Sequence, residues 1–397
     1  MTTLKQTSNG NVLYLQSGGP TGVINCSFLG LYETFRKHNC KGTFYVSRYG
    51  ISSFLEGKLE KIEGDYSFLR YKPGSHFGSL RKMLPDDISD PIGKEIADLL
   101  VKFNISYVFC NGGNDSMDTA YKLDCYCQKY QLDCKVIGIP KTIDNDLYGC
   151  DHTPGYGTAA KYVANSTIAI TIDEYTYKKG KILILETMGR DSGYVAASSY
   201  LASLRGMKPD YIYVPEVPFD TSVALDKAIK TYEEKGHCVI VVSEGIRGKD
   251  GKLISSPNVK DAFGNSVVGG VGSYLSSLFQ QRGYKARAVE LNTLNRSSTF
   301  LPCTTDIEEA YQVGASAYLY ALEGYSSKMV TIERVSSAPY VVKYGLIDLK
   351  NSRKEASSMP TKYINEAGDN INDSFLEYAA PLIRGNEIPL DEDGLLK

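Results

Sequence analysis

Short apolar runs recur along the chain, and longer segments between them repeat apolar residues with a helical period. Each run is rich in Val, Ile, Leu and Tyr and is bounded by Gly, Pro, Asn or Asp, a pattern typical of buried strands. The predicted strands are NVLYLQS (11–17), GTFYVSRY (42–49), ISYVFCN (105–111), CKVIGIP (134–140), KILILET (181–187), YIYVPEV (211–217), HCVIVVSE (237–244) and ARAVELN (286–292).

The segments between these runs predict amphipathic helices over residues 24–37, 90–103, 115–130 and 157–175. Strands that alternate with helices indicate βαβ units, mostly parallel sheets and right-handed crossovers. At 397 residues, two domains are expected rather than one. The last forty residues are polar and weakly periodic, so we expect them to pack on the surface.

Composition narrows the classes of partner. The 44 basic and 46 acidic side chains give a net charge of −2, which does not favour nucleic acid or a membrane surface as a partner. The amino terminus, MTTLKQTSNGN, lacks the apolar core of a signal peptide, and no apolar run is long enough to span a bilayer. We therefore expect a cytoplasmic protein whose anion sites are local.

The nine cysteines are scattered, and most lie inside apolar strand or helix patterns. Reduced, buried thiols are the favoured interpretation. Cys125 and Cys127 form a C-x-C pair, which differs from the C-x-x-C spacing of common zinc and redox sites. No second cysteine pair or histidine cluster completes a metal site there.

Glycines and polar residues follow several predicted strands at the point where each strand ends. Gly18 and Gly19 follow the first strand, Gly112 and Gly113 the third, and Gly189 the strand KILILET. A glycine turn between a strand and a helix presents backbone N–H groups to a phosphate. The polar stretch PKTIDND (140–146) also follows a strand, and ligands bind at such strand ends in open α/β sheets. Together these turns predict a phosphate-binding site.

Two nucleotide motifs were weighed against this interpretation. The sequence contains no G-x-x-x-x-G-K-[ST], so a P-loop is not supported. GYGTAA (155–160) fits G-x-G-x-x-A, but it follows DHTP rather than an apolar strand. Its glycines are better explained as positions where a helix packs closely.

Six motifs follow one another along the chain: SGGPTGVIN from Ser17, GSLR ending at Arg81, GGNDS from Gly112, PKTIDND from Pro140, MGR at 188–190 and LNR ending at Arg296. They occur in the order and approximate spacing of the 6-phosphofructokinases, and the sequence resembles that family over roughly its first 320 residues. It looks most like the pyrophosphate-dependent branch.

The resemblance implies two Rossmann-like three-layer αβα domains with mostly parallel sheets and an active site in the cleft between them. We expect residues 1–155 and 295–345 to form the phosphoryl-donor domain, and residues 156–294 and 346–397 the fructose 6-phosphate domain. The implied reaction is reversible transfer of a phosphoryl group from pyrophosphate to the 1-hydroxyl of fructose 6-phosphate, in glycolysis or gluconeogenesis. Seven-carbon sugar phosphates stay open as acceptors.

On this resemblance Asp144 is the base that takes the proton of the acceptor hydroxyl, and Thr142 hydrogen-bonds the substrate. Asp146, two residues on in an extended segment, points to the same side and orients the site. Arg81 bridges the donor and the transferred group. The backbone of Gly18, Gly19 and Gly113 holds the donor.

Lys141 and Asp115 decide the donor. ATP-dependent members of the family typically have glycine at both matching positions, which leaves room for the rest of the nucleotide. A carboxylate at 115 would exclude an α-phosphate, and a lysine at 141 would stabilise pyrophosphate and the charge that develops in transfer. Catalytic residues are thus expected to be Asp144, Lys141 and Arg81.

The acceptor pocket implied by the resemblance combines residues of several motifs. Lys181 and Arg287 usually come from a neighbouring subunit in this family, so a homodimer or homotetramer is expected. Thr293 stands where pyrophosphate-dependent relatives commonly have tyrosine, and Lys181 replaces a usual arginine. The expected substrate-binding residues, besides Thr142 and Asp144, are Met188, Gly189, Arg190, Glu244, Arg287, Arg296 and Lys181.

The resemblance also implies Mg²⁺, held by Asn114, Asp115 and Asp146, with an amide at 114 where many members have aspartate. Three alternatives were weighed: an ATP-dependent phosphofructokinase, disfavoured by Lys141 and Asp115; a non-catalytic sugar-phosphate-binding regulatory subunit; and a nicotinamide-dependent oxidoreductase that uses GYGTAA.

Overall fold

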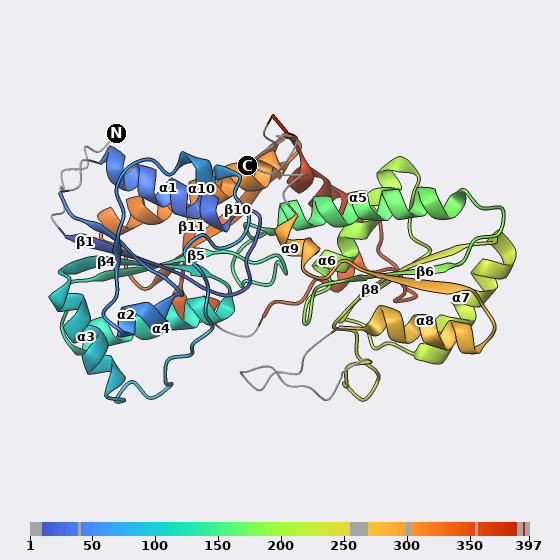
Figure 1. Cartoon of the computed structure of the whole chain (residues 1–397), viewed down its shortest axis with the longest axis horizontal. Helices are drawn as coiled ribbons and strands as arrows, with labels where there is room; N and C mark the ends of the chain where they lie inside the picture. Colours follow the sequence, from blue (N-terminus) through green and yellow to red (C-terminus); the bar gives the residue numbers. More distant parts are fainter. Residues whose placement is uncertain are drawn as a thin grey trace.

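The computed structural model describes residues 10–38, 41–254, 269–298, 303–353, 356–386 and 392–393. Two lobes lie side by side along the long axis of the molecule, and each has a β-sheet between layers of helices (Figure 1). Within these described ranges, no helix is both long enough and apolar enough to cross a membrane.

The first lobe contains a seven-stranded sheet with the order β11-β10-β5-β4-β1-β2-β3. Its inner pairs are parallel, and the edge strands β11 and β3 are antiparallel to their neighbours. The strands are β1 (Asn11–Gln16), β2 (Phe44–Ser47), β3 (Glu60–Lys61), β4 (Ile105–Gly112), β5 (Lys135–Pro140), β10 (Lys328–Ser337) and β11 (Tyr340–Asp348). Strands β1, β4 and β5 are buried almost throughout, which explains their nearly continuous apolar sequences.

The register of β1, β4 and β5 brings their carboxyl ends to one edge of the sheet. Gln16 pairs with Asn111, and Gly112 pairs with Pro140. The segments that follow these strands therefore begin side by side. This register places the glycine turns and PKTIDND together, as expected for a ligand site in an open α/β sheet.

Helices cover both faces of this sheet. On the upper face in Figure 1, α1 (Ile24–Lys37) packs along α10 (Thr304–Leu322), with the short 3₁₀ helix η1 (Ser67–Arg70) beside α1. On the lower face lie α2 (Ile51–Leu55), α3 (Ile92–Lys102) and α4 (Asn114–Lys129). The upper core is aromatic: the Phe28 ring meets the edges of Tyr14 and Phe77 at centroid distances of 5.1 and 4.7 Å.

The second lobe contains a four-stranded parallel sheet with the order β7-β8-β6-β9. The strands are β6 (Ile182–Thr187), β7 (Tyr211–Tyr213), β8 (Cys238–Ser243) and β9 (Ala286–Glu290). One face is covered by α5 (Tyr156–Tyr175), α6 (Tyr194–Ala197) and the 3₁₀ helix η2 (Ser198–Arg205), and the other by α7 (Thr221–Lys235) and α8 (Val271–Gln281) (Figure 1). The short helix α9 (Leu294–Ser297) follows β9.

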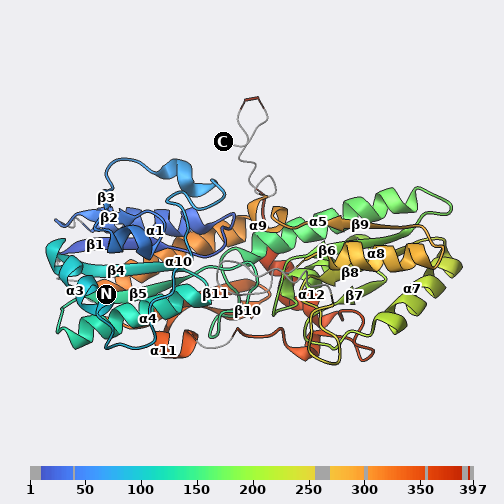
Figure 2. The ribbon, with the colours of Figure 1, turned by 60° about the horizontal axis from the view of Figure 1, so that its bottom comes forward.

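The carboxyl-terminal part of the chain packs first on one lobe and then on the other. After the β10–β11 hairpin, α11 (Leu349–Ser352) packs against α4 of the first lobe (Figure 2). Residues 356–386 then pack on the second lobe and contain η3 (Thr361–Tyr363), α12 (Ser374–Ala379) and η4 (Ala380–Ile383). The division into two domains stays a proposal, and the position of α11 favours a last boundary after residue 352 rather than at 345.

The predicted α/β class with mostly parallel sheets is confirmed. Every predicted strand and helix is present, with ends that differ by a few residues at most except in β7, whose predicted second half is a turn. The surface-packed carboxyl terminus was wrong for its described part, because Tyr363, Phe375 and Leu382 are buried in the second core. Strands β3, β10 and β11 were not predicted.

Candidate active site

A cleft of about 370 Å³ opens between the lobes, at the carboxyl ends of β1, β4 and β5 on one side and of β6 and β8 on the other. Most of the predicted site residues line this one cleft. They are Gly18, Gly19, Arg81, Gly113, Asn114, Asp115, Lys141, Thr142, Asp144, Asp146, Met188, Arg190, Glu244 and Arg296.

The loop after β5 carries both carboxylates of PKTIDND into the cleft. Asn145 between them has a left-handed backbone, with φ of 58°. The prediction of an extended segment is therefore wrong at Asn145. Asp144 and Asp146 nevertheless both line the cleft. The backbone N–H of Thr142 donates to the carbonyl of Pro154 at 3.2 Å, which closes the loop at its base.

Burial shifts the pKa values of both carboxylates. Burial raises the pKa of Asp144 above its ordinary value, and the neighbouring Lys141 ammonium opposes that rise. Burial and the nearby Asp144 charge raise the pKa of Asp146 to about 7. Asn114 donates a hydrogen bond from Nδ2 to Asp146 Oδ2 at 3.1 Å, which holds this side chain in place. A carboxylate with a raised pKa is a competent proton acceptor near neutral pH.

Lys141 is buried, with only 2% of its side chain exposed, and it faces the glycine turn after β1. Its Nζ donates to the carbonyl of Gly19 at 2.5 Å and to that of Ser17 at 3.2 Å. Gly18 has φ of 84°, and a Cβ there would lie 3.3 Å from Lys141 Nζ, so glycine permits both the turn and the approach. Burial, and then the nearby Arg81, lower the pKa of Lys141 to about 8.

Four cations converge on the cleft: Arg81, Lys141, Arg190 and Arg296. In the described part of the chain, no carboxylate oxygen lies within ion-pair distance of any of them. Burial, and to a smaller extent the like charge of Arg81, lower the pKa of Arg296. Unpaired cations beside glycine turns make a site for a highly charged anion.

Arg296 reaches further than the sequence analysis expected. A Cβ built on Gly19 would lie 3.0 Å from Arg296 Nη1, so the guanidinium touches the donor-side turn. It projects from α9 in the second lobe. Arg296 therefore spans the two halves of the cleft.

The acceptor side is formed by the segments after β6 and β8. The backbone N–H of Gly189 donates to Glu244 Oε1 at 3.3 Å, and burial raises the pKa of Glu244 to about 7. Asp191 also lines the cleft and was not predicted; its Oδ1 accepts from Arg247 Nη2 at 2.8 Å. Its position directly after Met188–Arg190 was the available signal.

Lys181 and Arg287 do not reach the cleft of their own chain. Lys181 precedes β6, and Arg287 lies near the start of β9. Both are therefore at the end of the second sheet where its strands begin, whereas the cleft lies where the strands end. Both line a separate groove, and Lys181 Nζ pairs with the buried Glu174 at 2.7 Å. The sequence indicates this placement, because Lys181 begins the predicted strand 181–187 and Arg287 is the second residue of the strand 286–292, whereas the site lies where strands end.

The oxygen atoms around Asn114 fit a magnesium ion that is shared with phosphate. Asn114 Oδ1 is buried and has no hydrogen-bond partner among the described residues, while Asp115 and Asp146 line the same part of the cleft. The described residues contain no group of three or more acidic, histidine or cysteine side chains gathered as metal ligands. Mg²⁺ commonly uses one or two protein oxygens together with substrate phosphates, so this donor set suits it.

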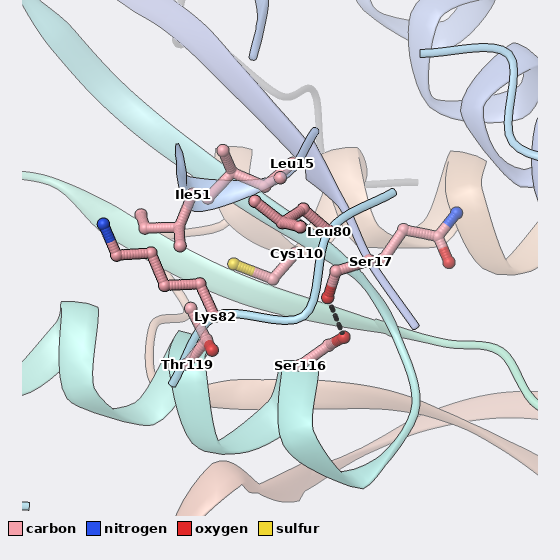
Figure 3. A pocket seen from close by; sticks show the side chains of 10 residues that line it. Leu15, Ser17, Ile51, Leu80, Lys82, Cys110, Ser116 and Thr119 are labelled. Carbon is pink, nitrogen blue, oxygen red and sulfur yellow. Dashed lines mark hydrogen bonds between the residues drawn. The ribbon is translucent and has the colours of Figure 1, made fainter. Parts of the chain in front are cut away.

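A small pocket of about 20 Å³ lies behind the glycine turn that follows β1, between the end of β1 and the first turns of α4 (Figure 3). The hydroxyl groups of Ser17 and Ser116 meet there at 2.7 Å, and the Cys110 thiol faces the same space. Such a volume holds about one water molecule. The hydrogen bond between Ser17 and Ser116 joins the glycine turn after β1 to the first turn of α4.

The GYGTAA segment begins helix α5, and a side chain of the protein already occupies its amino end. Asp306 accepts from the backbone N–H groups of Gly155 and Thr158, each at 2.8 Å. A Cβ on Gly157 would lie 2.7 Å from the carbonyl oxygen of Leu382. The segment is a packed, carboxylate-capped helix start and does not offer its amides to a dinucleotide phosphate.

Known proteins are similar to this chain over nearly its whole length. The family description Phosphofructokinase matches residues 11–320. Proteins named pyrophosphate–fructose 6-phosphate 1-phosphotransferase are similar: that of Halomonas elongata is 36% identical, over 98% of this chain and 95% of its own length, and that of Xanthomonas campestris is 37% identical, over 98% and 96%. A crystal structure of a pyrophosphate-dependent phosphofructokinase from Nitrosospira multiformis matches with a TM-score of 0.87 and 36% identity, over 98% of this chain and 95% of that one. The chain belongs to the phosphofructokinase family.

Proposed function

We propose that this protein transfers a phosphoryl group from pyrophosphate to the 1-hydroxyl of fructose 6-phosphate, giving fructose 1,6-bisphosphate and orthophosphate. The observation that carries the proposal is the placement of Lys141, whose buried ammonium lies against the donor glycine turn and one residue from Thr142. The names of the similar proteins support the same donor and acceptor.

Asp144 is the base in this proposal. Its carboxylate lines the cleft, and its raised pKa lets it take the proton of the sugar hydroxyl near neutral pH. Removing that proton as the oxygen attacks phosphorus makes the hydroxyl a better nucleophile. Thr142 Oγ1 accepts from the backbone N–H of Asp144 at 3.1 Å, which restrains the base.

The transferred phosphoryl group carries negative charge on its equatorial oxygens, and catalysis depends mainly on positioning it and stabilising that charge. Lys141, Arg81 and Arg296 converge where this group would lie. The backbone amides at the start of α4, beyond Gly113, add the positive end of a helix dipole. The Lys141 ammonium is already held by two backbone carbonyl groups before substrate binds, so little reorganisation of this cation is required.

Asp115, Asp146 and the carbonyl oxygen of the Asn114 side chain would hold Mg²⁺ in the proposed enzyme. When bound, the ion supplies charge neutralisation on the pyrophosphate oxygens. Asp115 stands exposed in the first turn of α4. Its carboxylate also disfavours a donor that places a further phosphate there.

A second copy of the chain completes the acceptor half in this proposal. Lys181 and Arg287 share one groove at the far edge of the second sheet, where a neighbouring subunit's cleft can meet them. They would bind the 6-phosphate together with the Arg190 side of the cleft. The assembly proposed is therefore a homodimer or homotetramer.

One assay tests the function. Purified protein receives fructose 6-phosphate and Mg²⁺ with either pyrophosphate or ATP, and bisphosphate formation is followed. We expect turnover with pyrophosphate, and also the reverse reaction with orthophosphate. Turnover with ATP alone would contradict the proposed donor, and no turnover with either would favour a sugar-phosphate-binding subunit.

A further inference from the structure

Asn145, between the two carboxylates of the cleft, points away from the cleft and into the protein. Its side chain is buried, and both ends of its amide are used. Nδ2 donates to the Tyr378 hydroxyl at 2.7 Å, and Oδ1 accepts from the backbone N–H of Thr153 at 2.9 Å. The amide thus cross-links the loop behind Asp144 and Asp146.

Tyr378 comes from α12, far away in the sequence. Its hydroxyl also donates to the carbonyl of Asp151 at 2.8 Å, so one phenol joins both arms of the loop. The ring packs among second-lobe side chains, with centroids 5.6 Å from Tyr194 and 5.5 Å from Tyr363. Tyr378 therefore connects the carboxylate loop to the core of the acceptor lobe.

The other end of the loop is anchored in the first lobe. Arg334 of β10 donates from Nη2 to Asp151 Oδ2 at 2.9 Å and from Nη1 to the carbonyl of Tyr378 at 2.9 Å. His152 lies between Asp151 and Glu309 of α10, at 2.8 and 2.6 Å. With the stem of the loop fixed in this way, the left-handed turn at Asn145 lies in the part of the loop that carries the two carboxylates.

We propose that Asn145 and Tyr378 are positioning residues that set the orientation of Asp144 through this hydrogen-bonded cross-link, an inference that rests on the proposed function. Neither side chain lines the cleft. Asparagine tolerates the left-handed backbone, and its amide fixes that turn only while Tyr378 and Thr153 hold it. Without the phenol, the turn is free to rotate, and the base leaves its position.

The first test is Tyr378→Phe, with Tyr363→Phe as the matched control. Tyr363 is buried in the same core, and no hydrogen bond of its hydroxyl joins it to the carboxylate loop in the described structure. We expect Tyr378→Phe to lower kcat by about tenfold to a hundredfold, since a misplacement of about 1 Å can cost that much. KM for both substrates should change by less than about twofold, and the control should resemble the wild type.

A second variant removes the other partner. Asn145→Gly keeps a residue that accepts positive φ but deletes the amide, so it should lose as much kcat as Tyr378→Phe. The combined loss in the double variant should be smaller than the product of the two single losses, because both variants remove the same Asn145–Tyr378 hydrogen bond. In an Asp144→Asn background, Tyr378→Phe should leave the residual rate unchanged, since its effect passes through the base.

Hydrogen exchange of residues 141–155 gives a readout that does not need activity. Exchange at this loop should be faster in Tyr378→Phe and Asn145→Gly than in Tyr363→Phe. An unchanged kcat in Tyr378→Phe, or an equal further loss in the Asp144→Asn background, would overturn the inference while the proposed function stands. If the wild type turns over neither donor, the proposed function fails, and an unchanged exchange rate in Tyr378→Phe would then reject the cross-link as well.

Discussion

The donor and acceptor halves of the cleft are built in different ways. The donor half is tied together within one lobe: Ser79 Oγ donates to the Gly18 carbonyl at 2.7 Å, Lys141 holds Gly19, and Ser17 meets Ser116. The acceptor half has Arg190 and Glu244 in place, while Lys181 and Arg287 lie at the opposite edge of their sheet. In the proposed function, a single chain therefore holds a nearly complete donor site and an incomplete acceptor site.

The difference follows from the two sheets. Adjacent parallel strands β1, β4 and β5 end side by side, so three short turns can hydrogen-bond to one another around a small anion. The second sheet supplies the segments after β6 and β8 to the cleft, and the segment after β9 adds Arg296, which reaches the glycine turn after β1. Charges for the far end of a longer substrate must then come from elsewhere, and a second copy is the source we propose.

In the proposed function, the donor half depends most strongly on Asp144, the proposed base. Asp144→Asn keeps the shape of the side chain and removes the proton acceptor, so kcat should fall by a factor of about 10²–10⁴. Binding of fructose 6-phosphate and pyrophosphate, measured by calorimetry, should stay detectable. A rate close to that of the wild type would show that another group takes the proton.

The loop that carries the base also rests on a buried ion network, which links the donor half to protein stability. Burial alone would lower the pKa of His152, but Glu309 and the hydrogen bonds to Asp151 and Glu309 outweigh it and raise the pKa from 6.5 to about 9. The stabilisation is fully present below pH 6.5 and is lost as pH rises through 9. Chemical denaturation at pH 6 and pH 10 should show a loss of about 3 kcal/mol in the free energy of unfolding that is absent in His152→Gln.

The surface residue His38, exposed at the end of α1, provides the control for that measurement. His38→Gln should show the same loss between the two pH values as the wild type. An equal loss in His152→Gln would mean that other groups, and not this histidine, cause the pH dependence.

Much of this architecture could be predicted from sequence because it is local. Strand β1, its glycine turn and α1 occupy one continuous segment, and apolar runs bounded by glycine are sufficient to indicate them. Strands β10 and β11 were missed because they form an amphipathic hairpin at the sheet edge, where polar residues such as Glu333 and Lys343 interrupt the apolar run. Edge strands exposed on one face resemble surface loops in their composition.

The site could be predicted where motif residues act in their own cleft, and not where long-range packing decides. Lys141 and Asp144 lie in one short motif that follows a strand. Tyr378 approaches Asn145 across 233 positions, and no periodicity indicates such a contact.

The acceptor half can be tested by removing the charge of Arg287, which lies outside the cleft of its own chain. Arg287→Ala should raise KM for fructose 6-phosphate by about 10–100-fold, the equivalent of losing a charged hydrogen bond, with little change in KM for pyrophosphate. Arg282→Ala is the control, since Arg282 is an exposed neighbour paired with Asp226.

Mixed assemblies separate a shared site from a remote structural effect. Subunits that carry Asp144→Asn or Arg287→Ala should regain part of their activity when they are unfolded and refolded together, because one cleft of the mixed dimer combines an intact base with an intact Arg287. The absence of any recovery in mixed dimers isolated by differential tagging would contradict the sharing of Arg287 between subunits.

The smallest expected effect concerns the choice between pyrophosphate and ATP as the phosphoryl donor. Lys141→Gly with Asp115→Gly removes an ammonium and a carboxylate from the donor side, where both side chains occupy space and the carboxylate repels a further phosphate. The ratio of ATP to pyrophosphate turnover should rise about tenfold, or about 1.4 kcal/mol, chiefly because pyrophosphate loses the Lys141 ammonium and ATP gains room. Lys82→Gly, beside the small pocket behind the turn, is the control and should leave the ratio unchanged. If the double variant discriminates against ATP as strongly as the wild type, donor choice lies in the depth of the cleft rather than in these two side chains, and the donor half would be defined by its backbone alone.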